Sequence, residues 1–196
     1  MHRLVPGHIS GPKEWLSNIT KSAGTIVRKD ETMKGKIKLF TDSAADLPQI
    51  YQKRYDIDLV PLSVIFGEEE FKDGVTLSHA DFWARLETSK DLPSTNQANP
   101  NDFVEAFGPY IDRGYTILYI GLSSKLSGTL QSAVLAKDLL GTDQVKVFDS
   151  RSASIGETLL LIRAGEMIRD GFDLDEILNS SNKTGKNRLH TSRSIH

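Results

Sequence analysis

Short apolar runs alternate with helix-like segments along most of the chain, and this alternation restricts the fold more than any other feature. Residues 116–120 form a continuous apolar run, residues 129–140 have a helical pattern that ends at Gly141, and residues 145–148 repeat the apolar run. Strands joined through helices must cross over and therefore run parallel. The sequence predicts an α/β fold with an open, mainly parallel sheet flanked by helices.

Further elements continue the same alternation on both sides of this unit. Residues 37–40 predict a strand, and Asp46 and Pro48 predict the start of a helix, because proline is favoured in a first helical turn. Residues 59–66 predict a second strand, with a turn at residues 67–69 that leads into residues 70–72. We therefore expect a small hairpin to hang from the main sheet.

Capping residues mark the remaining helices. Ser78 is expected to cap a helix whose spacing places Phe82, Trp83 and Leu86 on one buried stripe. Asn99 is expected to cap a helix that begins at Pro100 and turns Phe103, Phe107 and Tyr110 inward. A later helix is expected to run to about Asp170 and to end at Gly171. Asp173 and Glu176 predict a capping box for one more helix.

The two ends of the chain differ from its middle. Residues 1–32 are polar and lack a sustained period, so they predict a poorly ordered extension before a domain that starts at Met33. Residues 179–196 are rich in Ser, Asn, Lys, Arg and His, and they predict an unpatterned tail. We expect one α/β domain over residues 33–178 and, after it, the truncation of a second domain.

Composition excludes several classes of function. The chain has 196 residues, no cysteine and a net charge of −2. Disulfides, thiolate catalysis and Cys-ligated metal sites are therefore absent, and a nucleic-acid binder would need a basic stripe that the chain lacks. No apolar run approaches the length of a membrane span, and the N-terminus lacks the apolar core of a secretory signal. We expect a cytoplasmic protein.

Four hydroxyl-rich loops are the strongest functional signal. They are residues 41–43, 94–97, 122–129 and 149–154. In parallel sheets, ligands bind where the loops after the strands converge, and helix N-termini offer unpaired N–H groups there. The loops therefore predict a site for an anionic headgroup such as a carboxylate, although Ser, Thr and Asp also serve as ordinary helix caps and turn formers.

Candidates for catalysis are few. Asp42 follows a buried strand, which leaves open a magnesium-dependent phosphatase or phosphotransferase in which this carboxylate attacks phosphorus. A metal held by Asp42 and Asp149 is a weaker possibility. His79 opens a helix and is better explained as a surface residue, and no Gly-x-Ser-x-Gly or Walker spacing is present. The residues themselves predict neither an enzyme nor a metal site.

Five blocks of sequence resemble the DegV family, in the same order and at similar spacing. They are Phe40-Thr41-Asp42-Ser43-Ala44-Ala45-Asp46-Leu47-Pro48, Ile57-Asp58-Leu59-Val60-Pro61-Leu62, Pro93-Ser94-Thr95-Asn96-Gln97, residues 123–133 and Asp149-Ser150-Arg151-Ser152-Ala153-Ser154. The most specific is Leu-Ser-Ser-Lys-Leu-Ser-Gly-Thr at residues 122–129. The resemblance covers about residues 33–178.

This resemblance implies a lipid carrier that is not itself an enzyme and needs no cofactor. DegV proteins hold one long-chain fatty acid, such as palmitate, between two α/β domains, and some present it to the catalytic subunit of a fatty acid kinase. The resemblance places the carboxylate on Thr95 and Ser127, with Asn96, Gly128 and Ser43 as supporting residues. The chain departs from the family at Asn96, which is usually Ser.

A second departure is Ala98, where the family usually has Pro, and a third is the expected lack of a second domain. That domain would supply part of the acyl tunnel, so we expect the chain alone to bind fatty acid weakly or not at all. A truncated fragment without activity remains a further hypothesis beside the fatty-acid carrier and the phosphatase.

Overall fold

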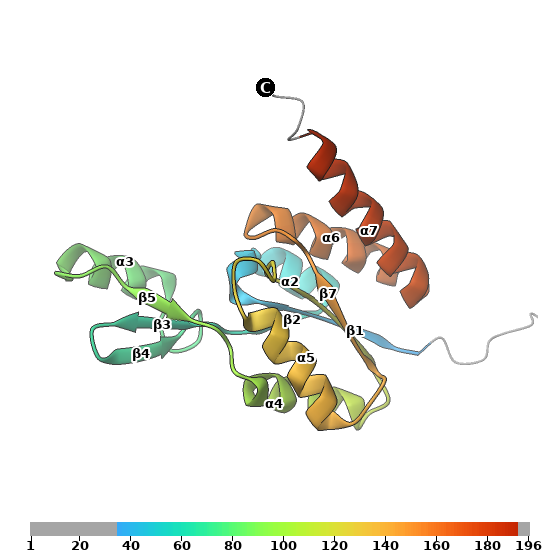
Figure 1. Cartoon of the computed structure of the whole chain (residues 1–196), viewed down its shortest axis with the longest axis horizontal. Coiled ribbons are helices and arrows are strands. Elements are labelled where there is room, and N and C mark those ends of the chain that lie inside the picture. Colours follow the sequence, from blue (N-terminus) through green and yellow to red (C-terminus); the bar gives the residue numbers. More distant parts are fainter. Residues whose placement is uncertain (1–34, 192–196) are drawn as a thin grey trace, which may run out of the picture. The chain divides into compact units, whose positions relative to one another are not determined.

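A four-stranded parallel sheet forms the centre of the computed structural model, which describes residues 35–191, with side chains through residue 183 (Figure 1). Its strands are β1 (Ile37–Asp42), β2 (Ile57–Val60), β6 (Thr116–Gly121) and β7 (Val145–Asp149). They lie in the order β2-β1-β6-β7, and every adjacent pair is parallel. The predicted open α/β fold is confirmed.

Helices cover both faces of this sheet (Figure 1). On one face lie α2 (Gln49–Tyr55), α6 (Ile155–Arg169) and α7 (Leu174–Thr191). On the other lie α4 (Pro100–Ile111) and α5 (Thr129–Leu140). A short 3-10 turn, η1 (Ser43–Ala45), joins β1 to the segment before α2.

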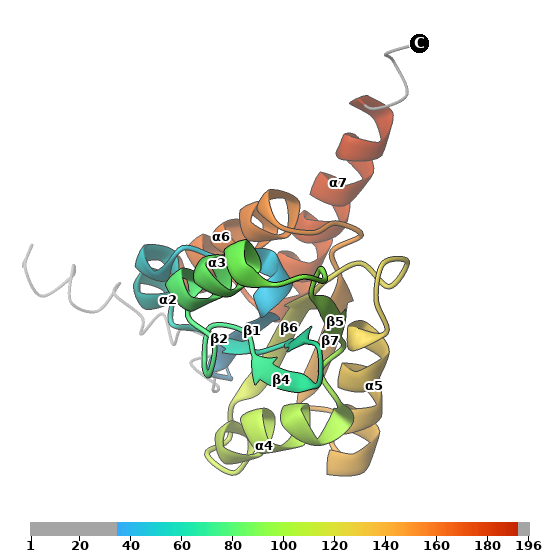
Figure 2. The same ribbon diagram turned by 90° about the vertical axis from the view of Figure 1, so that its left-hand side faces the viewer.

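A smaller antiparallel sheet lies beyond the carboxyl ends of the main strands (Figures 1 and 2). It consists of β3 (Ser63–Phe66), β4 (Glu69–Lys72) and β5 (Ser94–Asn96), in the order β4-β3-β5, and α3 (His79–Thr88) packs against it. The predicted hairpin is therefore present. The single strand predicted over residues 59–66 is wrong: it divides between the two sheets around Pro61, whose nitrogen cannot donate to a strand ladder.

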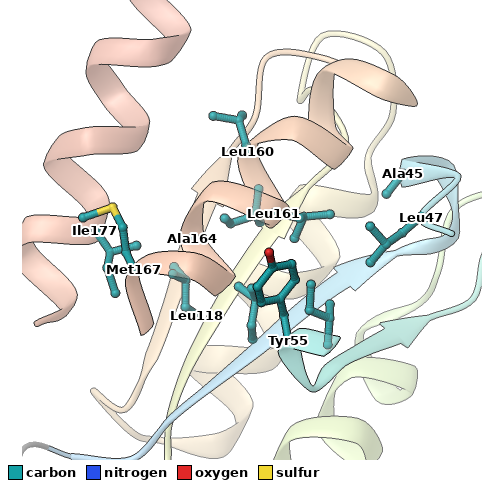
Figure 3. Packing of buried hydrophobic residues seen from close by; sticks show 12 residues of the cluster. Ala45, Leu47, Tyr55, Leu118, Leu160, Leu161, Ala164, Met167 and Ile177 are labelled. Carbon is teal, nitrogen blue, oxygen red and sulfur yellow. The ribbon is translucent and has the colours of Figure 1, made fainter. Parts of the chain in front are cut away.

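Each face of the main sheet has its own core, because successive side chains of a strand point to opposite sides. Leu39, Leu118 and Ile120 pack with Tyr55 and the inner side of α6. Figure 3 shows Leu118 and Tyr55 beside Leu161 and Ala164 of α6. On the opposite face, Phe40, Ile117, Tyr119 and Val145 pack with Phe103, Phe107, Ala133 and Ala136. The neighbours Leu39 and Phe40 thus bury opposite faces of one strand, as a continuously apolar run requires.

The predicted caps are present. Ser78 accepts a hydrogen bond from the Asp81 N–H, Asn99 and Asp102 form a reciprocal capping box, and Asp173 and Glu176 form another. Gly141 ends α5 in the left-handed conformation that glycine adopts most readily. The buried stripe predicted for α3 is wrong in part, because Trp83 is 61% exposed while Phe82 packs on the small sheet.

The boundaries expected at the two ends fare differently. α7 continues to Thr191, so the segment after Leu178 begins as helix rather than as an unpatterned tail. The extension expected over residues 1–32 and the domain start at Met33 lie outside the described residues.

Gly165 provides a test of how tightly α6 packs on α2. A Cβ atom at this position would lie 2.6 Å from the Cβ and Cγ atoms of Tyr55, at the fixed base of that side chain. We expect Gly165→Ala to lower the free energy of unfolding by about 1–3 kcal/mol through overpacking. Urea denaturation measures the change. Gly108→Ala is the matched control, because a Cβ there meets no atom within 4 Å, and an equal loss in both variants would contradict this packing.

Candidate ligand-binding site at the carboxyl ends of the strands

The candidate site lies where the chain reverses its direction of strand addition. From β1 the chain adds β2 on one side and later β6 on the other, so the β1–β6 boundary is a topological switch point. The loops that leave adjacent strands in opposite directions open a crevice at such a point, and open α/β sheets bind ligands there. Asp42 and Gly121 end the two strands at this boundary.

Asp42 ties the ends of β1 and β6 together. Its carboxylate is fully buried and accepts hydrogen bonds from the Tyr119 hydroxyl (2.6 Å), the Leu122 N–H (2.9 Å) and the Ala44 N–H (3.1 Å). Gly121 leaves room for this arrangement, because a Cβ there would overlap the Tyr119 ring. The carboxylate therefore fixes the starts of two of the loops that surround the site.

A second buried acid, Glu157, lies nearby in the first turn of α6. One of its oxygens accepts a hydrogen bond from the Thr41 hydroxyl at 2.8 Å, and the other, Oε2, has no partner among the described residues. Burial, the neighbouring charge of Asp42 and the charge of Asp46 raise the pKa of Glu157 to about 9. Glu157 is therefore a neutral carboxylic acid at pH 7.

Of these two buried acids, Glu157 is protonated and Asp42 is ionised. Burial raises the pKa of Asp42 as well, but its three donors favour the charged form. Glu157 has one donor, the Thr41 hydroxyl. Burial and the charge of Asp42 also raise the pKa of Tyr119 well above its usual value, so its hydroxyl remains a donor.

Backbone hydrogen bonds join the other loops to this centre. The Ser123 N–H donates to the Ser152 carbonyl at 2.9 Å, the Ser150 N–H to the Gly121 carbonyl at 3.1 Å, and the Ser154 N–H to the Ala44 carbonyl at 2.9 Å. Ser154 has φ 49° and ψ −126°, a conformation that strains a residue with a Cβ atom. The contact with Ala44 holds this strained residue at the start of α6.

The Asp149 side chain joins two of the hydroxyl-rich loops. It accepts hydrogen bonds from the Ser124 hydroxyl (2.6 Å) and from the Arg151 N–H (2.8 Å). Asp149 thus organises the loops after β6 and β7. The described residues contain no cluster of three or more His, Cys, Asp or Glu side chains that could hold a metal ion.

Ser127, one of the two predicted headgroup residues, lies directly before α5. Its hydroxyl lies 2.9 Å from the Thr129 hydroxyl and accepts a hydrogen bond from the Thr129 N–H at 3.2 Å. Thr129 is fully buried, so it gives the partly exposed Ser127 a fixed base. Gly128, the N-cap of α5, has no side chain that could cap the helix, and the hydroxyl of Ser127 accepts from the first helical N–H in its place.

Thr95, the other predicted headgroup residue, is exposed on β5 and faces Val64 across an antiparallel pair. The sequence had indicated that three of the four hydroxyl-rich loops directly follow a strand. Thr95 instead lies within β5 and does not follow a strand of the main sheet. Asn96 pairs with Ser63 in the same ladder, and the hydroxyl of Ser43 accepts a hydrogen bond from the Leu62 N–H at 3.1 Å. Ser43 therefore supports the chain that leads into the small sheet.

The structure also assigns roles that the sequence did not. Asp42 is a buried anchor with its oxygens occupied, so a phosphoryl group cannot reach it in this conformation. Glu157 and Tyr119 were not predicted as parts of the site. The sequence shows an acidic residue, Glu157, in the first turn of the helix that follows residues 149–154. Only the fold shows that its side chain is buried beside Asp42.

A separate groove of about 890 Å³ runs along α2 and β2. Its lining includes Ser43, Asp46, Asp58 and His79 but neither Thr95 nor Ser127. The groove is therefore distinct from the two predicted headgroup residues.

Large apolar side chains are exposed close to the hydroxyl-rich loops. Leu126 directly precedes Ser127, Ile155 begins α6, and Leu92 lies two residues before β5; their exposed fractions are 68%, 74% and 87%. Single exposed apolar residues are common on folded domains, so the relevant feature of these three is their position in the chain beside the loops.

Hydroxyl-rich loops that are joined to one another at a topological switch point are typical of small-molecule binding domains of the α/β class. The profile of the family described as "Uncharacterised protein, DegV family" matches residues 36–191. The chain belongs to the DegV family.

Curated relatives carry the same family name. A DegV domain-containing protein of Clostridium perfringens, CPE1310, is 39% identical over 142 residues, which are 72% of this chain and 51% of the relative. A relative from Caldanaerobacter subterraneus, TTE1491, is 36% identical over 149 residues, or 76% of this chain and 53% of the relative. The chain thus spans about half the length of the curated relatives it matches.

Solved structures show the same fold. A Thermotoga maritima protein, described as revealing a fatty acid binding function, has a TM-score of 0.73 and 34% identity, with 79% of this chain and 56% of that chain covered. A DegV family protein from Thermus thermophilus, described by its fatty acid binding, has a TM-score of 0.70 and 30% identity, with 77% and 54% covered. No helix within the described residues is long and apolar enough to span a membrane.

Glu157 makes folding depend on pH in a defined direction. From its usual pKa of 4.5 up to about 9, the folded protein keeps a proton that the unfolded chain releases, so its stability falls as the pH rises through this range. We expect Glu157→Gln to raise the free energy of unfolding by about 1–3 kcal/mol at pH 8 and by little at pH 5. Chemical denaturation at both pH values measures it.

The matched control is Glu166→Gln, on the outer side of the same helix, where the carboxylate lies 3.6 Å from Arg163 and is partly exposed. It should change stability little at either pH. A Glu157→Gln variant that is less stable than the unmodified chain at pH 8 would contradict a neutral Glu157.

Proposed function

We propose that this chain forms the headgroup-binding half of a fatty-acid-binding protein. The observation that carries the proposal is the position of Ser127 at the start of α5, where the buried Thr129 holds its hydroxyl in place. Thr95 supplies a second hydroxyl from β5. Two hydroxyls and a helix N-terminus suit a carboxylate, which accepts hydrogen bonds and carries negative charge.

Three further observations support a fatty acid over other carboxylates. Leu126, Ile155 and Leu92 expose apolar side chains beside the headgroup loops. Structures similar to this chain are described as fatty-acid-binding proteins, including one with stearic acid from Eubacterium ventriosum and one loaded with heptadecanoic acid from Eubacterium eligens. Asp42, the candidate nucleophile of a phosphatase, is buried and occupied by three donors.

We propose further that the apolar tail needs protein beyond this chain. Burial of each methylene group stabilises a complex by about 0.8 kcal/mol, so a long acyl chain contributes more than the headgroup hydrogen bonds. The chain spans about half of its relatives, and its apolar residues near the site are open to solvent. The second domain then completes the tunnel, and a fatty acid kinase catalytic subunit is the proposed partner that uses the carrier in the cytoplasm.

The first test concerns the chain alone. We expect weak binding of palmitate or none, because only one wall of the tunnel is present. Native mass spectrometry of the purified chain, before and after organic extraction, should show little or no co-purified fatty acid, and calorimetric titration should show no tight saturable binding. Saturable sub-micromolar binding by this chain would contradict the proposed need for a second domain.

The second test concerns the two hydroxyls. Octanoate is soluble at concentrations where weak binding can be followed by NMR shifts. Because each hydrogen bond to a charged group contributes about 1.5–3 kcal/mol, Thr95→Ala and Ser127→Ala should each weaken octanoate binding about tenfold or more. Thr88→Ala is the control, since that hydroxyl bonds only to carbonyls of its own helix. Unchanged affinity in both site variants would refute the assigned headgroup contacts.

A further inference from the structure

We propose that Gln97 is a positioning residue that fixes the distance between Thr95 and Ser127. Its side chain bridges the end of β5 and the start of α5, and we call this contact the Gln97 bridge. The inference rests on the proposed function for what the two hydroxyls bind. It adds the device that holds them in place, which neither the hydroxyl pattern nor the likeness to DegV proteins assigns.

The fold places the two hydroxyls on separately packed layers, and the Gln97 bridge joins these layers. Thr95 belongs to the small sheet, which has its own core of Val64, Phe66 and Leu77. Ser127 belongs to the main layer, whose core on that side is centred on Phe103, Phe107 and Tyr119. Groups that bind one ligand together must be held within about 0.5 Å of their working geometry. Two separately packed layers need a direct contact beside the ligand to reach that precision.

The close approach of the Gln97 side chain to Gly128 shows this contact. A Cβ atom at Gly128 would overlap the Gln97 side-chain amide, and it would lie 2.9 Å from the Gln97 Cδ atom. The Gln97 amide therefore lies directly against the Gly128 backbone, in the space that any other residue at position 128 would fill. Gly128 is the neighbour of Ser127, so the bridge contacts the headgroup loop beside its hydroxyl.

A hydrogen bond fixes the direction of the bridge. The Gln97 Nε2 donates to the Ser132 hydroxyl at 3.3 Å, and Ser132 is only 2% exposed on α5. The Ser132 N–H in turn donates to the Gly128 carbonyl at 3.1 Å. The amide of Gln97 therefore spans the first turn of α5, contacting Gly128 at its start and Ser132 one turn later.

Both ends of the bridge are anchored. Ala98, the residue after Gln97, is fully buried in the main core, and Asn99 then forms the capping box of α4. On the other side, Thr95 is paired with Val64 in the small sheet. A change at Gln97 should therefore move Thr95 relative to Ser127 without unfolding either layer.

Two other side-chain links within residues 35–183 join the main layer to the segments around β3 and β4. Ser43 bonds to the Leu62 N–H just before β3, and Lys72 of β4 forms an ion pair with Asp102 of α4 at 3.0 Å. β5 has the Gln97 bridge in this role. Loss of the bridge should loosen β5 and leave the β3–β4 hairpin attached.

Amide hydrogen exchange of the chain, followed by NMR, tests this inference without a ligand. Gln97→Ala and Gly128→Ala should each speed exchange in the β3–β5 pairing by about tenfold or more, with exchange in α6 unchanged. In Gly128→Ala, the new methyl group displaces the flexible end of Gln97. The double variant should be no faster than the faster single variant, because both substitutions break one contact.

Gly108→Ala is the matched glycine control, since a Cβ there meets no atom within 4 Å, and it should leave β5 exchange unchanged. Unchanged exchange of β5 in Gln97→Ala, or effects of the two substitutions that add independently, would overturn the bridge.

A second arm separates the bridge from the proposed function. In the unmodified chain, octanoate should shift the amides of Thr95 and Ser127 along one common titration curve. In Gln97→Ala the common affinity should be weaker and the shift of Thr95 should shrink relative to that of Ser127, because the two hydroxyls no longer reach one carboxylate together. Coupled exchange effects without any octanoate shifts in the unmodified chain would support the bridge and refute carboxylate binding. An unchanged affinity together with an unchanged ratio of the two shifts in Gln97→Ala would refute the positioning role.

Discussion

The buried carboxylate of Asp42 is the interaction on which the arrangement of the site depends. It receives three hydrogen bonds, and two of them come from Tyr119 and from the Leu122 N–H, at the end of the neighbouring strand. A buried charge is tolerated only where donors replace the water it has lost. The requirement to satisfy Asp42 therefore fixes the ends of β1 and β6 together, and the hydroxyl-rich loop after β6 starts from that fixed point.

Burial and the charge of Asp42 together raise the pKa of the neighbouring acid Glu157. Glu157 lies close enough to Asp42 that two ionised carboxylates would repel one another in a medium without water, and its pKa rises to about 9. Its second oxygen, which has no partner in the described part of the chain, and the strained backbone of Ser154 lie in the same turn at the start of α6. Strain and unsatisfied polar groups concentrate at functional sites, because surrounding contacts must hold such features in place. Both features support the carboxyl end of the sheet as the functional edge of this domain.

Local signals in the sequence predicted β1, β6 and β7 as short apolar runs, and they predicted the capping boxes of α4 and α7. The capping box at Asn99 and the glycine stop at Gly141 are local features and were confirmed. The break at Pro61 and the exposure of Trp83 depend on how segments pack, which local pattern does not record. The hydroxyl-rich loops could be recognised from the sequence. The contact of Gln97 with Gly128 could not, because it joins positions far apart in the chain that only the fold brings together.

A crystal structure of the chain grown with saturating octanoate is the most direct test of the central claim that this edge of the sheet binds a carboxylate. We predict a carboxylate within hydrogen-bonding distance of the Thr95 and Ser127 hydroxyls, with its alkyl chain directed toward the exposed apolar residues Leu126 and Ile155. A carboxylate bound instead in the groove along α2 and β2, with the hydroxyls of Thr95 and Ser127 left unoccupied, would contradict it.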